Sequence, residues 1–103
     1  MAHDPRALRR RQIDDVVVKA LARAFRWREM LERGQCSTVK EIAALERINE
    51  SYIARIVRLT LLAPDIVEAL VDGRQSPDIA LPILMKRLKP AWSEQRATFR
   101  RIT

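Results

Sequence analysis

The stretch Val39–Leu59 reads VKEIAALERINESYIARIVRL and decides the fold, because its helical pattern is broken once, at residues 46–50 (ERINE). Strong helix formers lie on both sides of the break, and apolar residues such as Ile53 and Ile56 follow helical spacing. The break contains Asn49, a residue suited both to a turn and to capping the next helix. The pattern therefore predicts two short helices joined by a tight turn, in place of one long helix.

Capping signals and buried positions define the two helices. Thr38 and Glu41 form a capping box, in which Thr38 is the N-cap and Glu41 reaches back to it. The second helix of the pair extends over residues 50–62 and ends before Pro64, which opens another helix. The residues predicted to be buried are Val39, Ile42, Ala43 and Leu45 in the first helix, and Ile53, Ile56, Val57 and Leu61 in the second.

Further helices are predicted on both sides of this pair. A long helix begins at Ile13 and is closed by Gly34, with one apolar and one basic side. Its apolar side comprises Ile13, Val17, Ala20, Ala24, Trp27 and Leu31, widened by Val16 and Leu21, and its basic side comprises Lys19, Arg23, Arg26 and Arg33. We expect Trp27 to lie in the core and the basic side to face solvent.

The C-terminal half and the two ends complete the predicted organisation. Gly73 ends the helix that Pro64 opens, and a fifth helix over residues 78–88 is shortened or bent at Pro82. The predicted fold class is therefore all-α, with four to five short helices and a central helix-turn-helix over about residues 38–61. Residues 1–12 are predicted to be a flexible basic arm, residues 13–89 the helical domain, and residues 90–103 a tail or short helix with Trp92 and Phe99 on one side.

Charge and composition restrict the function classes. The 103 residues carry a formal net charge of +7 and a pI near 10.7, which favours a polyanionic partner such as nucleic acid. Residues 1–34 hold nine Lys and Arg against five Asp and Glu, whereas residues 63–89 hold four of each. No apolar run reaches the roughly 18 residues of a membrane span, and the single Cys36 allows no internal disulfide. We therefore expect a cytoplasmic protein.

Two short amphipathic helices around a tight turn form the pattern by which many proteins read DNA. The second helix would place its exposed N-terminal half in the major groove, where Glu50 could accept from cytosine or repel phosphate. Arg47 stands where the turn favours glycine, because that position tends to require a positive φ. The predicted base contacts are Asn49, Ser51, Tyr52 and Arg55, and the predicted phosphate contacts are Lys40, Arg47 and Arg58.

Residues 38–73 resemble the helix-turn-helix of ParB/KorB-type partition proteins. The likeness departs from that family at Arg47, where the family has glycine, and after Gly73, where RQSPDIALPIL replaces a Gly-His-Ala motif. The chain also lacks the family's nucleotide-binding motifs, so the resemblance implies DNA binding and not partition activity. The matching residues are Ala43, Ser51, Tyr52, Ile53, Arg58, Leu59, Pro64 and Gly73.

A longer likeness covers residues 13–96. The segments VKALARAFRWREMLERG, LLAPDIVEALVDGRQ and WSEQR are similar to the C-terminal region of some phage-type serine site-specific recombinases. This resemblance implies a prokaryotic, phage- or recombinase-related DNA-binding region, either stand-alone or a fragment of a larger protein. The nucleophilic serine and arginine cluster of the recombinase catalytic domain have no counterpart here.

The sequence offers no pattern for catalysis or for a cofactor. His3 and Cys36 are the only residues of their kinds, and the two glycines are too far apart for a phosphate loop. We therefore predict no enzymatic activity, no metal, no cofactor and no small-molecule substrate. The rival interpretation is a helical interaction module without DNA binding. A homodimer through neutral residues 63–89 with Trp92 and Phe99 is compatible with either interpretation.

Overall fold

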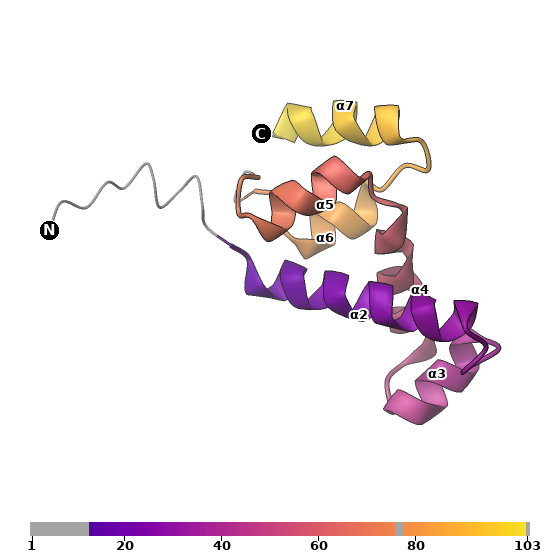
Figure 1. Ribbon diagram of the computed structural model, residues 1–103. Coiled ribbons are helices and arrows are strands. Elements are labelled where there is room, and N and C mark those ends of the chain that lie inside the picture. The colour runs from indigo at the N-terminus through magenta and orange to yellow at the C-terminus, as the bar shows by residue number, and fades with distance from the viewer. Residues whose placement is uncertain (1–12, 76–77, 103) are drawn as a thin grey trace, which may run out of the picture.

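The computed structural model describes residues 13–75 and 78–102, and within these the chain forms six α-helices, one 3₁₀ helix and no strand (Figure 1). The predicted all-α class is confirmed. The helix count exceeds the prediction because residues 92–102, expected as a tail or short helix, form a complete helix. The predicted arm over residues 1–12 lies outside the described residues. The helices are α2 (Asp15–Glu32), α3 (Val39–Glu46), α4 (Glu50–Val57), η1 (Arg58–Leu61), α5 (Pro64–Val71), α6 (Leu81–Lys86) and α7 (Trp92–Ile102).

Helix α2 is the longest element, and both of its ends have a local chemical cause. The Asp14 carboxylate caps the first turn by accepting from the backbone N–H groups of Val16 and Val17. At the other end Gly34 adopts φ +75°, and the N–H of Gln35 donates back to the Met30 carbonyl at 3.0 Å. The aspartate and the glycine therefore fix the length of the helix.

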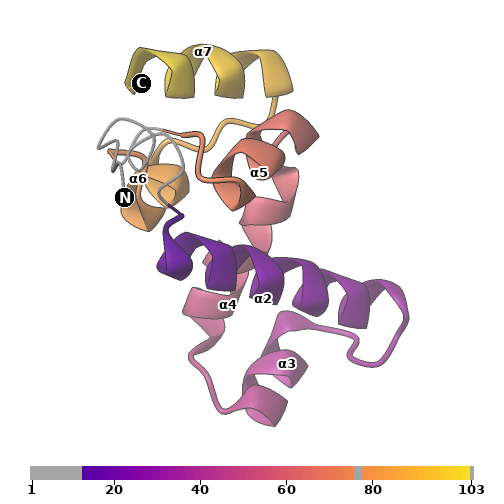
Figure 2. The ribbon, with the colours of Figure 1, turned by 60° about the vertical axis from the view of Figure 1, so that its left-hand side comes forward.

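Helix α2 also organises the core, since it packs against α4, η1, α5 and α6 (Figures 1 and 2). Trp27 is fully buried, as predicted, and its indole N–H donates to Glu46 at the end of α3. The predicted apolar side included Ile13 and Val16, but these residues are 49% and 61% exposed. The core begins only at Val17, so the first turn of α2 extends beyond it.

The N-cap of α3 forms as predicted, but the Glu41 side chain has a different hydrogen-bond partner. The Thr38 hydroxyl accepts from the Glu41 N–H, as expected. The Glu41 carboxylate reaches the N–H of Ser37 at 2.6 Å, and not that of Thr38. Leu45 was predicted to be buried and is 67% exposed, because it lies on the side of α3 turned away from α2 and α4. Ile42 is fully buried and joins α3 to the core.

The predicted helix over residues 50–62 is split, since α4 ends at Val57 and residues 58–61 form the 3₁₀ helix η1. Pro64 forces the preceding Ala63 into an extended conformation, ψ 143°, so an α-helix cannot continue through this point. The tighter turn changes which side chains face inward: Leu59 is fully buried, and Leu61, predicted to be buried, is 45% exposed.

Proline and glycine set the remaining boundaries. Pro64 occupies the first position of α5, and Gly73 follows that helix with φ +71°, as predicted. Pro82 lies in the first turn of α6, which is therefore shortened at its start and not bent. Phe99 is buried, whereas Trp92 on the same helix is 50% exposed. Helix α7 therefore closes the core with only part of its apolar side.

Candidate nucleic-acid interface

The turn between α3 and α4 consists of residues 47–49, and each of them has a different structural role. Arg47 adopts the left-handed conformation, φ 57° and ψ 44°, as its glycine-like position predicted. Ile48 is half-buried against the core, and its N–H donates to the Ala43 carbonyl at 3.2 Å. Asn49 caps α4 by accepting from the Tyr52 N–H at 3.2 Å. The chain therefore reverses in one tight corner whose geometry is held from both ends.

The Arg47 conformation leads to a stability prediction. A left-handed φ costs a non-glycine residue about 1 kcal/mol, and glycine removes most of that cost. We expect Arg47→Gly to raise the melting temperature by about 4–8 °C for a domain of this size, as measured by circular dichroism. Ala44→Gly, at an exposed interior position of α3, is the matched control and should lower it, because glycine weakens a helix. A lower melting temperature for Arg47→Gly would contradict the claim that the backbone of Arg47 is strained.

The exposed side of α4 carries most of the predicted base contacts. Ser51 and Arg55 are exposed and Tyr52 is half-buried at the edge of the helix. The Arg55 Nε donates to the Ser51 carbonyl at 3.4 Å, so the arginine lies along its own helix. Asn49 caps the helix as predicted, and the cap engages its carbonyl oxygen and leaves its amide nitrogen for a base. Helix α4 therefore presents one arginine, one hydroxyl and one phenol side by side.

The predicted phosphate contacts are exposed but spread out. Lys40 is in the first turn of α3, Arg47 is in the turn, and Arg58 begins η1. Lys40 and Arg47 are seven residues apart, which corresponds to about 10 Å along a helix. Within the described part of the chain none of the three forms an ion pair with a carboxylate. Their charges are therefore available to an external anion along a line that follows the helix-turn-helix.

Helix α6 adds a residue that the sequence did not indicate. A groove of about 460 Å³ separates α4 from α6 and is bordered by Tyr52 and Arg55 on one side and by Lys86 on the other. Lys86 is exposed and forms no ion pair among the described residues. Its position at the end of a short apolar helix could be predicted, but its proximity to α4 could not, because some thirty residues separate them. The groove brings a second cation beside the predicted base contacts.

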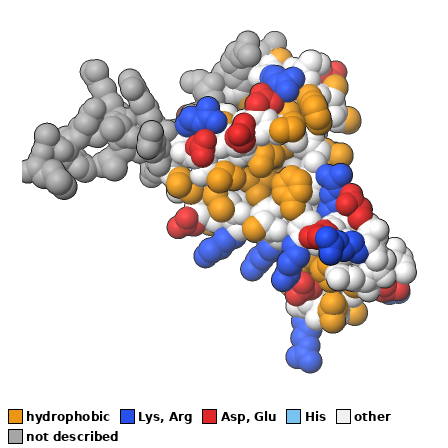
Figure 3. Space-filling model, in the orientation of Figure 1, with side chains coloured by type: hydrophobic (Ala, Val, Ile, Leu, Met, Phe, Trp, Pro, Cys, Tyr) orange, Lys and Arg blue, Asp and Glu red, His pale blue; other side chains and the backbone are white. Residues whose placement is uncertain are grey.

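A row of basic residues also lies on α2, as predicted. Figure 3 shows Lys and Arg side chains gathered along the lower side of this helix. Arg26 in this row is bound to Glu46 of α3, and Arg33 pairs with Glu29 at 2.8 Å. Lys19 and Arg23 are exposed without such a partner in the described residues. The row is therefore only partly neutralised by neighbouring carboxylates.

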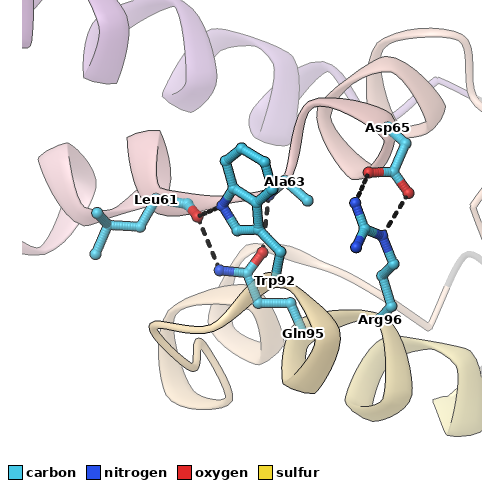
Figure 4. A network of polar contacts seen from close by, with 6 residues as sticks. All are labelled: Leu61, Ala63, Asp65, Trp92, Gln95 and Arg96. Atoms are coloured by element: carbon cyan, nitrogen blue, oxygen red, sulfur yellow. Dashed lines mark hydrogen bonds and ion pairs between the residues drawn. The ribbon is translucent and has the colours of Figure 1, made fainter.

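The residues of the WSEQR segment hold α7 on the turn that follows η1 (Figure 4). Gln95 is fully buried and accepts from the Ala63 N–H at 2.8 Å, while its amide nitrogen donates to the carbonyls of Leu61 and Lys89. The Trp92 indole N–H donates to the same Leu61 carbonyl at 3.2 Å. This segment therefore acts as a structural clamp. It satisfies backbone groups that the irregular chain at residues 61–63 leaves without helical partners.

An ion pair extends this clamp at the surface. Arg96 donates two hydrogen bonds, at 3.0 and 2.8 Å, to the Asp65 carboxylate in the first turn of α5. These hydrogen bonds hold the pKa of Asp65 below its usual value and raise the pKa of Arg96. The lowered pKa means that this contribution to stability is present above the unfolded-state pKa of Asp65 and is lost as the pH falls through the folded-state value.

The geometry defines the class: an all-α domain with a compact helix-turn-helix whose second helix exposes a polar side with one arginine, Arg55. No family model matches the chain, and no curated protein or solved structure matches it either. The resemblance to partition proteins and to phage-type recombinases therefore stays a prediction from the sequence. Among the described residues, no group of His, Cys, Asp and Glu is arranged to hold a metal ion. No helix in the same residues has the length and apolar character needed to cross a membrane.

Proposed function

We propose that this chain is a sequence-specific double-stranded DNA-binding protein that uses α3 and α4 as a helix-turn-helix, without catalysis of its own. The observation that carries the proposal is the exposed side formed by α4 and the start of η1, where Arg55 and Arg58 have no carboxylate partner in the described residues. In a chain of net charge +7, unpaired arginines on a helix held by a tight turn suit the negative major groove of DNA.

The proposal assigns separate roles to the exposed residues. Asn49, Ser51, Tyr52 and Arg55 contact bases, with Arg55 able to form two hydrogen bonds to guanine and Tyr52 able to contact a thymine methyl. Lys40, Arg47 and Arg58 bind phosphates and orient the helix. To these residues we add Lys86, because it shares the α4–α6 groove with Arg55. The proposal includes a cytoplasmic location and a phage- or recombinase-related setting, both of which rest on the sequence alone.

In vitro selection from randomised duplexes tests this assignment. The natural chain should enrich one motif, and Arg55→Ala should lose preference at one position of it at a cost of about 1–3 kcal/mol. Lys40→Ala is the matched comparison, because it also removes one exposed cation. It should lower the affinity for all DNA sequences alike and leave the enriched motif unchanged. Failure of the natural chain to enrich any motif would exclude sequence-specific recognition.

The rival interpretation, an interaction module without DNA binding, makes a different prediction. Such a module should show no DNA affinity that falls with salt, because it would release no counterions from the duplex. An exposed apolar area around Phe25 and Trp92 favours some protein contact as well. The two activities are compatible, since many helix-turn-helix proteins bind two half-sites as dimers.

A further inference from the structure

A second surface of the molecule is apolar and electrically neutral. Phe25 of α2 and Trp92 of α7 are 41% and 50% exposed, and both border a groove of about 330 Å³. The groove is also lined by Leu62, Pro64 and Val67. We call this surface, formed by the two aromatic residues and the groove between them, the aromatic patch. Large exposed aromatic side chains beside an apolar groove are typical of protein contact sites.

The aromatic patch lies away from the basic side of α2. Phe25 follows Lys19 by six residues and Arg23 by two, which places it about 120° and 160° around the helix from them, while Arg26 lies about 100° from it. Figure 3 shows hydrophobic side chains gathered above the row of Lys and Arg side chains. The patch is therefore available to a partner while the basic side remains free.

The charges around the aromatic patch cancel locally. Arg28, which borders the groove, pairs with Glu32 at 2.7 Å. On α7, Arg96 lies one helical turn after Trp92 and pairs with Asp65, next to Pro64 of the groove. Each of these two ion pairs joins one positive and one negative group, in a chain whose net charge is +7. Two copies of so basic a protein repel each other in most orientations, and this surface minimises that repulsion.

We propose that the aromatic patch is a homodimer interface in which two copies meet patch to patch. A two-fold interface brings each surface against its own copy, so the two ion pairs beside the patch of one copy can face oppositely charged partners on the other. The Trp92 ring is held by its hydrogen bond to Leu61, so little side-chain freedom is lost when it is covered. The sequence predicts a homodimer interface formed by residues 63–89 with Trp92 and Phe99. Phe99 is 3% exposed and belongs to the protomer's own core, and Phe25 takes its place.

Sedimentation equilibrium without DNA tests the proposal over protein concentrations of about 1–500 μM, so the outcome does not depend on DNA binding. We expect the natural chain to shift from monomer to dimer in this range, and Phe25→Glu to raise the dimer dissociation constant at least about tenfold, since an interface aromatic contributes more than about 1.4 kcal/mol. Trp92→Glu should act in the same direction. Phe25 is 41% exposed, whereas the Trp92 indole also donates to Leu61, so Phe25→Glu is the primary variant and its melting temperature should stay close to that of the natural chain.

Val16→Glu is the matched control. Val16 is a 61% exposed apolar residue of the same helix, nine positions earlier and on the opposite side from Phe25. It should leave the dimer dissociation constant unchanged. A chain that stays monomeric throughout the concentration range would overturn the proposal and leave the patch to a different protein. A dimer that Phe25→Glu and Trp92→Glu do not weaken would also overturn it, because the interface would then lie elsewhere.

Discussion

Gln95→Leu should destabilise the protein by roughly 2–4 kcal/mol, because the Gln95 amide is fully buried and its three hydrogen bonds are to backbone groups. Leucine has a similar volume but leaves the Ala63 N–H without its partner, and an unsatisfied buried donor costs about 1–3 kcal/mol. Urea denaturation measures the change directly. The melting temperature should fall by more than about 10 °C.

One further variant at Gln95 separates the loss of hydrogen bonds from the loss of packing, and one variant at the neighbouring Glu94 serves as the control. Gln95→Glu keeps the size and an acceptor for Ala63, but at neutral pH it cannot donate to the carbonyls of Leu61 and Lys89. We expect it to be destabilised as well. Glu94→Ala, at the neighbouring exposed position of α7, should stay within about 0.5 kcal/mol of the natural chain. Equal stability of Gln95→Leu and the natural chain would show that α7 does not clamp the chain at residues 61–63.

The double variant Arg55→Ala/Arg58→Ala should lower DNA affinity about 30-fold or more at fixed salt. Loss of the Arg55 base contact should cost about 1–3 kcal/mol, loss of the Arg58 phosphate contact adds to it, and a combined loss of about 2 kcal/mol corresponds to that factor. Both side chains are exposed and free of carboxylate partners in the described residues, so their removal should leave the melting temperature nearly unchanged. Fluorescence anisotropy with a labelled duplex measures the affinity.

The matched control removes two other cations from the same chain. Arg33→Ala/Arg74→Ala gives the same net charge, but these arginines already pair with Glu29 and Asp72. We expect this control to lower the DNA affinity far less than Arg55→Ala/Arg58→Ala does. Equal losses in the two variants would mean that net charge alone, and not helix α4, determines affinity.

Local signals in the sequence predicted the backbone well. Thr38 and Asn49 cap their helices, Pro64 opens α5, and Arg47 adopts the left-handed conformation, because each of these features depends on neighbours within a few residues. Burial was predicted less well. Leu45 and Leu61 follow helical spacing but are exposed, since spacing alone does not reveal which side of a short helix meets the core.

Contacts between distant segments could not be predicted at all. Gln95 binds backbone groups at residues 61 and 63, more than thirty positions earlier, and only the fold brings them together. The same holds for Lys86 beside Arg55 and for Phe25 beside Trp92. The exposed residues of α4 were predicted to be accessible, and they are, whereas their contacts with DNA stay a prediction.

The measurement that tests DNA binding most directly is fluorescence anisotropy of a random-sequence duplex titrated with the natural chain across a salt series. If Lys40, Arg47 and Arg58 bind phosphates, the logarithm of the binding constant should fall linearly with the logarithm of the salt concentration, with a slope of about −3 or steeper. The Arg55→Ala/Arg58→Ala variant should reduce that slope by about 1, because Arg58 is the phosphate contact of the two. An absence of binding at low salt, in a chain of net charge +7, would contradict the proposed function.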